Sequence, residues 1–184
     1  MSRAGARGLA AALIAALALS LALAGCGSSA VKPAAYVKAV CVALGSWRNT
    51  IQSAGVALES SGASKASRPV AKLDYQRFVS SLVTATQRAA HALHAAGTPA
   101  VPGGRQVAQR LDSAFGRAAK GLAAASAQAK RIPTDSPTSF QLGTSAVNAQ
   151  IRSALEQIAH VSPGESRELR SAAAREPACQ VLAG

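Results

Sequence analysis

The chain has 184 residues and a formal net charge of +12, and only 3% of its residues are aromatic. Alanine dominates the apolar residues; it is the strongest helix former and is depleted in strands. The composition therefore favours closely packed helices over a β architecture, and the length suits a single domain.

The first 25 residues have the organisation of an export signal. Arg3 and Arg7 precede an apolar run over residues 9–23, which is shorter than the roughly 20 residues that span a hydrocarbon core. A positive segment followed by a short apolar run is typical of a cleaved signal peptide rather than of a membrane anchor. No later segment approaches membrane length, so we expect the remainder to be soluble.

The apolar run ends in Leu23-Ala24-Gly25-Cys26, which resembles the lipobox of bacterial lipoproteins. The resemblance implies cleavage before Cys26, attachment of a diacylglycerol and of fatty acids such as palmitate at that residue, and a lipid-anchored protein on the extracytoplasmic face of the cell membrane. The alternative is an ordinary secretory signal with an unrelated cysteine near the cut. Removal of residues 1–25 lowers the formal charge from +12 to +10.

Two cysteines remain for a disulfide. The chain contains three, an odd number for an exported protein, and lipidation would consume Cys26. An oxidising compartment would preserve a bond between Cys41 and Cys179. The alternative is two free thiols.

Four segments of the mature chain have apolar residues at alternating spacings of three and four, as one face of a helix requires. We expect helices at about 33–59, 69–96, 104–131 and 136–161, and a short fifth helix that begins near Ser162 and ends near Arg175. The first two helices should bury Val37, Val40, Leu44, Trp47, Ile51, Ala54 and Leu58, and Tyr75, Phe78, Leu82, Ala85, Ala89 and either Ala92 or Leu93.

Proline and serine mark the starts of these helices. Pro33 suits a first turn, Ser136-Pro137 suits an N-cap followed by the first helical residue, and Ser162 and Glu165 have capping-box spacing. Gly116 and Gly121 lie inside the third helix and indicate either a close neighbouring helix or a local weakness.

Short connections between helices of similar length predict an all-α fold. It is an up-down-up-down four-helix bundle with a short fifth C-terminal helix and a disulfide-clasped tail. The expected organisation is a signal peptide over 1–25, a lipidated tether over 26–32 and one domain over 33–184. Segment one starts and segment four ends at the same end of such a bundle, which brings Cys179 back to Cys41.

The sequence offers little catalytic chemistry. His91, His94 and His160 fall on outward positions, so we expect no metal site, and the eight acidic residues are scattered. No nucleophile or phosphate-binding motif stands out, so we expect neither an enzyme nor a cofactor, with a hydrolase as the least favoured alternative.

Basic residues are dispersed along all the helices. They are densest at Arg105, Arg110, Arg117, Lys120, Lys130 and Arg131. These side chains form either a solvated surface or a surface for anionic lipid headgroups or wall polymers. We do not expect nucleic acid as a partner, because the chain is exported and its aromatic residues should be buried.

Several segments resemble those of small exported lipoproteins of actinobacteria. They are the lipobox, Val40-Cys41, Gly97-Thr98-Pro99-Ala100-Val101-Pro102, Glu168-Leu169-Arg170-Ser171-Ala172 and Pro177-Ala178-Cys179. The resemblance implies a cell-envelope location and a helical domain, and it supplies no functional residues. We therefore expect a non-enzymatic interaction or structural module at the membrane surface; the alternative is a ligand-binding lipoprotein with a pocket between helices.

Overall fold

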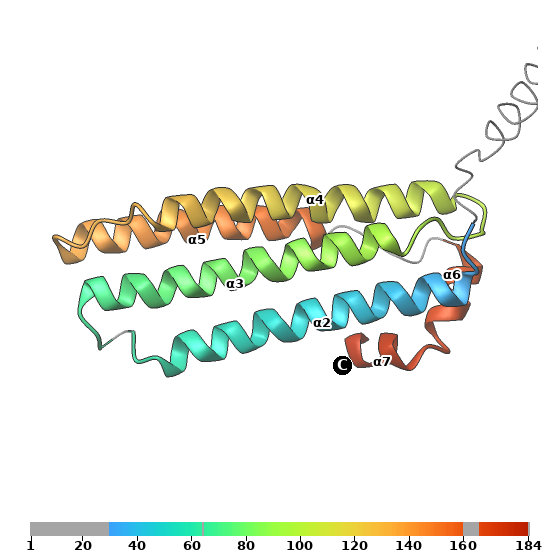
Figure 1. Ribbon diagram of the computed structural model, residues 1–184, viewed down its shortest axis with the longest axis horizontal. Coiled ribbons are helices and arrows are strands. Elements are labelled where there is room, and N and C mark those ends of the chain that lie inside the picture. Colours follow the sequence, from blue (N-terminus) through green and yellow to red (C-terminus); the bar gives the residue numbers. More distant parts are fainter. Residues whose placement is uncertain (1–29, 64, 160–165, 184) are drawn as a thin grey trace, which may run out of the picture.

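The computed structural model describes residues 30–63, 65–159 and 166–183. This part of the chain forms the long helices α2 (Pro33–Ser60), α3 (Arg68–Ala95), α4 (Gly104–Ala129) and α5 (Pro137–Ala159), followed by the short helices α6 (Arg167–Ala173) and α7 (Pro177–Ala183). The four long helices run antiparallel to their neighbours in the chain (Figure 1). The predicted all-α, up-down-up-down bundle is confirmed. The leader and Cys26 lie outside the described residues.

Local sequence sets the helix starts largely as expected. Pro33 occupies the first turn of α2, and the Ser136 hydroxyl accepts a 3.1 Å hydrogen bond from the Ser139 N–H at the start of α5. The predicted Ser162–Glu165 cap lies outside the described residues. The described part of the fifth helix, α6, begins at Arg167, where the Ser166 hydroxyl accepts from the Leu169 N–H.

Three of the four pairs of neighbouring long helices pack against each other, and the fourth pair does not. α2 packs against α3, α3 against α4 and α4 against α5, whereas α2 and α5 make at most a marginal backbone contact among the described residues. Among the described residues, α5 contributes only the partly buried Ile158 to the core at the end where α2 begins. α6 supplies the buried residues Leu169 and Ala172 there.

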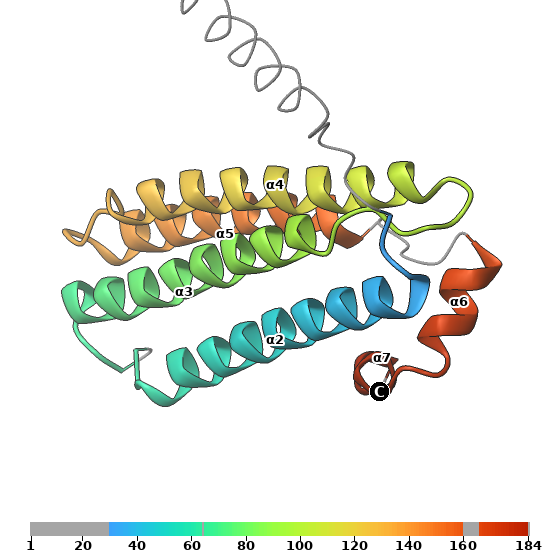
Figure 2. The ribbon, with the colours of Figure 1, turned by 45° about the vertical axis from the view of Figure 1, so that its right-hand side comes forward.

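The core accordingly divides into two clusters along the bundle. At the end where α2 begins, α2, α3 and α4 pack with Leu169 and Ala172 of α6. At the other end, α3, α4 and α5 form a second cluster in which Ile51 and Leu58 of α2 are only partly buried. Thus α6 adds its buried residues to the first cluster beside Ile158 of α5, and it lies across that end of the bundle (Figures 1 and 2).

A disulfide fixes the C-terminal helices to α2. Cys41 and Cys179 are bonded with their Cα atoms 5.0 Å apart, as predicted. Cys41, Gly45 and Arg48 follow one face of α2, and the Arg48 guanidinium donates to the Leu182 carbonyl at 3.0 Å. The Leu182 side chain lies 4.0 Å from where a Cβ of Gly45 would stand. The expected tail is thus a second short helix, since Pro177 begins α7 rather than only ending α6.

Several buried positions differ from the expected apolar faces. Val79 is fully buried where Phe78 was expected, and Phe78 is half-buried against the second cluster. Leu93, not Ala92, faces the core of α3. Tyr36, which the pattern of α2 did not include, is only 2% exposed. The first cluster includes residues of α6 and the second includes residues of α5. The side of a helix that faces the core therefore changes along the length of the helix.

The two glycines inside α4 have different roles. A Cβ on Gly121 would lie 2.8 Å from the Ala154 Cβ, so this glycine permits the close approach of α5. A Cβ on Gly116 would meet nothing within 4 Å, so this glycine only weakens the helix. The first alternative therefore holds for Gly121 and the second for Gly116.

We predict that loss of the disulfide lowers the free energy of unfolding. The bond joins residues separated by 138 positions, and chain entropy gives a stabilisation of about 5 kcal/mol as an upper value. Urea unfolding of the Cys41→Ser/Cys179→Ser variant measures the loss, and the wild-type protein under reducing conditions should match it. Alkylation of both thiols in the unreduced exported protein would contradict the bond.

The glycine pair gives a matched test of the α4–α5 contact. Gly116→Ala should raise the free energy of unfolding by up to about 1 kcal/mol, because alanine favours the helix and has room. Gly121→Ala should be less stable than Gly116→Ala by about 1–3 kcal/mol, because its methyl group would overlap α5. Equal stabilisation by both substitutions in thermal melts would show that α5 does not approach Gly121.

Candidate functional site

The segment that leads from Cys26 is bound to the bundle before α2 begins. The Val31 N–H donates to the Thr98 carbonyl at 2.7 Å, and the Ala100 N–H donates to the Val31 carbonyl at 2.7 Å. Together they form a parallel bridge of Val31 with Pro99 in the α3–α4 connection. We call this feature the tether bridge.

Two glycines make room for the tether bridge. Gly97 has a φ of 75°, and a Cβ there would lie 3.1 Å from the Val31 side chain. A Cβ on Gly104 would overlap the Pro99 carbonyl oxygen. Side chains at these positions would displace the α3–α4 connection, so the glycines hold the bridge against the start of α4.

The tether bridge lies on the end of the bundle that α6 covers. A depression of about 320 Å³ at this end is lined by Pro102 and Gly103 of the connection, by α4 and by Ser166 before α6. The exposed cations at this end include Lys32, Arg105 and Arg167, and we call these three the tether-end cations. Three exposed cations at the opposite end, the far-end cations, are Lys65, Lys130 and Arg131.

Few of the cations are neutralised by neighbours. Two ion pairs lie wholly within the described residues: Arg77 with Asp74 at 2.7 Å, and His94 with Asp112 at 3.4 Å, the latter only when the imidazole is protonated. The tether-end and far-end cations take part in neither. Both ends of the bundle thus present positive charge to solvent.

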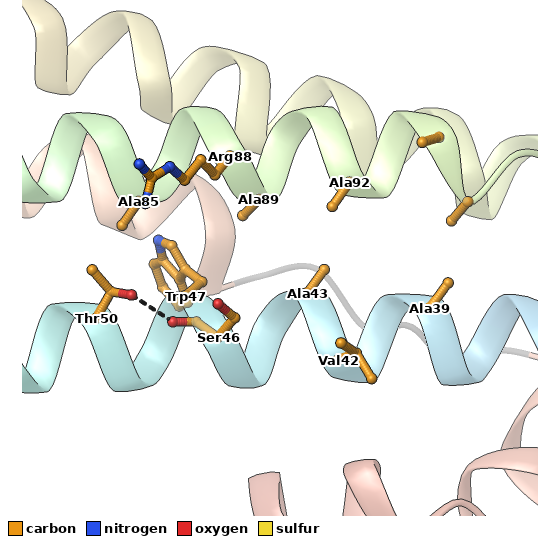
Figure 3. Close-up of a pocket in the computed structure, with 12 residues that line it drawn as sticks. Ala39, Val42, Ala43, Ser46, Trp47, Thr50, Ala85, Arg88, Ala89 and Ala92 are labelled. Carbon is orange, nitrogen blue, oxygen red and sulfur yellow. Dashed lines mark hydrogen bonds between the residues drawn. The ribbon is translucent and has the colours of Figure 1, made fainter.

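A groove of about 460 Å³ runs between α2 and α3 on the outside of the bundle. The wall from α2 consists of Ala39, Val42, Ala43, Ser46, Trp47 and Thr50. The wall from α3 consists of Ala85, Arg88, Ala89, Ala92, Ala95 and Ala96. Figure 3 shows the Trp47 ring directed from α2 toward α3 across the space between the two helices. We call this space the α2–α3 groove.

The α2–α3 groove has a polar end and an apolar end. Ser46 and Thr50 of α2 lie opposite the part of α3 that carries Arg88, and the Thr50 hydroxyl donates to the Ser46 carbonyl at 2.8 Å. From there toward the start of α2 the lining is entirely Ala and Val. No acidic residue lines the groove, so Arg88 is its single charge.

Trp47 connects the α2–α3 groove with the core. Its ring stacks edge-on against Phe115 with a centroid distance of 5.5 Å. Its indole N–H donates to the Thr86 hydroxyl at 3.0 Å, and Thr86 is the only polar residue in the described chain that is classed as buried. Both interactions hold the indole in one orientation.

The tyrosines are placed as packing residues. Burial raises the pKa of Tyr36 and of Tyr75 to about 12, and the Tyr75 hydroxyl donates to the Asn148 side-chain oxygen at 2.7 Å. Both phenols are therefore neutral at physiological pH. Neither has the lowered pKa that an acid–base or nucleophilic role would need.

The other residues considered from sequence are placed as follows. His91 and His94 are exposed on α3, as expected, and His160 lies outside the described residues. Within the described residues, no group of three or more His, Cys, Asp or Glu side chains is arranged to hold a metal ion. No helix there is long and apolar enough to cross a membrane.

The sequence suggests a pocket between helices only as an alternative and does not locate it. Ala85, Ala89 and either Ala92 or Leu93 are expected on the core-facing side of α3; Ala92 is exposed at the groove, whereas Ala85 and Ala89 are buried beneath it. A usable signal was present in the run of small residues on both helices, since small side chains leave a hollow between neighbours.

Comparison of the chain with protein-family models, with curated proteins and with solved structures finds no match.

Proposed function

We propose that the protein is a non-enzymatic cell-envelope lipoprotein, anchored through lipid on Cys26 at the extracytoplasmic face of the membrane. It acts there as an interaction or structural module. The tether bridge is the observation that carries the proposal beyond the leader. Because Val31 is bound to the bundle, the chain from Cys26 to Val31 spans at most about 18 Å. A lipid on Cys26 would hold the tether end close to the headgroups.

Charge supports the same placement. The chain after the leader carries a formal charge of +10, and the tether-end cations are exposed. A basic residue near an anionic membrane surface contributes about 1 kcal/mol of attraction, which falls off within a Debye length of about 10 Å. A tether that spans at most about 18 Å keeps the tether end within about two Debye lengths of the surface in the proposed arrangement. Anionic lipid headgroups are therefore the proposed partner.

A second function is favoured by the α2–α3 groove. Its volume of about 460 Å³ falls in the range of small-molecule sites, and its lining is mostly apolar with a few polar groups at one end. Under this second proposal the protein is a ligand-binding lipoprotein, and the membrane anchor serves to locate the groove.

The anchoring proposal predicts the behaviour of Cys26→Ser. Oxygen cannot replace the thioether sulfur, so the variant should incorporate no labelled fatty acid and should leave the membrane fraction. Cell fractionation after labelling with a fatty-acid analogue measures both. Wild-type protein and Cys41→Ser/Cys179→Ser are the controls, since both retain Cys26. Continued labelling of the Cys26→Ser variant would refute lipidation at this residue.

The electrostatic part predicts vesicle binding by the chain from residue 27, which contains all the described residues. It should sediment with anionic vesicles at low salt, hardly at all with neutral ones, and lose binding at high salt. Replacing the three tether-end cations by Gln should weaken binding at least tenfold. The same replacement of the three far-end cations is the matched control and should weaken it less. An equal effect of both triple variants would refute the proposal that the tether end faces the membrane.

A further inference from the structure

We infer that the α2–α3 groove binds a single-chain anionic amphiphile, with the acyl chain along the apolar end and the anionic head at Arg88. The inference rests on the second proposed function and names its ligand class. It is independent of the membrane anchor, because every residue of the groove belongs to α2, α3 or the first residue after α3.

The polarity of the groove fixes the orientation of the ligand. Arg88 and the hydroxyl-bearing Ser46 and Thr50 lie at one end, and the remaining length is lined by alanine and valine. From Thr50 to Ala39 the groove follows α2 for about 16 Å at 1.5 Å per residue, of which the alanine and valine part beyond Ser46 takes about 10 Å. An elongated groove with an apolar part and polar groups at one end matches an extended hydrocarbon chain with a polar head.

The positive charge of Arg88 determines which charge the head group of the ligand carries. Arg88 is exposed, lies on the groove wall and has no acidic neighbour among the lining residues. A guanidinium pairs with carboxylate or phosphate through charge-assisted hydrogen bonds, and Ser46 offers a hydroxyl donor on the facing helix. A cationic head would meet repulsion instead. A carboxylate or a phosphate monoester is therefore the head that this end of the groove fits.

The lining suits the hydrocarbon chain of such a ligand. Alanines on both walls and the Trp47 ring present an apolar surface along the groove (Figure 3). Val42 is 53% exposed at the apolar end, where contact with a chain would remove its surface from water. Trp47 is the only tryptophan of the chain, so its fluorescence reports occupation of the groove directly.

The test titrates the chain from residue 27 with dodecanoate below its micelle concentration and follows Trp47 fluorescence. Dodecanol and dodecyltrimethylammonium provide the neutral and cationic heads on the same chain. We expect saturable binding of dodecanoate, binding about fivefold weaker for dodecanol, and the weakest for the cation. Shortening the carboxylate by two methylene groups should weaken binding about fourfold, if half of each methylene surface is buried.

Two pairs of variants locate the ligand. Arg88→Gln should remove the preference for dodecanoate over dodecanol, whereas Arg152→Gln, an exposed arginine on α5, should leave it unchanged. Ala92→Phe places a ring in the groove from an exposed position and should abolish binding; Ala124→Phe, at an exposed position of α4, is its matched control. Thermal melts establish that all four variants fold.

The outcomes separate the ligand class from the ligand-binding function itself. If all three heads bind equally and Ala92→Phe still blocks them, the groove is a binding site but the anionic assignment is overturned. If no amphiphile changes Trp47 fluorescence, or if Ala92→Phe binds like Ala124→Phe, the groove does not bind this class of ligand and the inference fails. Neither outcome bears on the proposed anchoring at Cys26, which cell fractionation and fatty-acid labelling test separately.

Discussion

The division of the core between α5 and α6 is the constraint on which the rest of the structure depends. Among the described residues, α5 contributes only the partly buried Ile158 to the first cluster, at the end where α2 begins. α6 covers that cluster with Leu169, and the Cys41–Cys179 bond keeps the two short helices in place. Helices of seven residues are not stable alone, so the covalent link and the packing on α2 must supply what their own hydrogen bonds cannot.

The same arrangement explains why α2 carries the α2–α3 groove. α2 is held by α3 on one side and by α6 and α7 on the other, and it makes no substantial contact with α5. No residue of α2 beyond Ala43 is classed as buried. The second half of α2 therefore contacts the core only through partly buried side chains, and the hollow between the alanines of α2 and those of α3 stays open to solvent. Trp47 is one of these side chains and reaches inward to Phe115 and Thr86.

Much of this fold could be predicted because its signals are local. Pro33, the Ser136-Pro137 pair and the alternating spacing of apolar residues each act within one or two turns, and the helices begin where these residues indicate. The disulfide followed from the antiparallel topology together with the number of cysteines. Pro177 was read only as the end of a helix, but proline equally suits a first turn, and the structure uses it so.

The remaining features depend on distant parts of the chain. Whether Phe78 or Val79 is the buried residue depends on how α3 is rotated about its own axis, by the angle between two successive residues. Packing against α4 and α5 determines that rotation. Gly121 and Gly116 look alike in the sequence, and only the position of Ala154 distinguishes them. Gly104 is required because Pro99 is drawn against it by a bridge to Val31, some 70 positions away in the chain.

The candidate sites also divide into those recognisable from local sequence and those that depend on distant parts of the chain. The lipobox is a local motif and is recognisable without a structure, whereas the tether bridge and the α2–α3 groove are each built from two segments far apart in the chain. The two sites share α3: its C-terminal end runs into the connection that binds Val31, and its alanines form one wall of the groove. The position of α3 therefore sets the geometry of both sites.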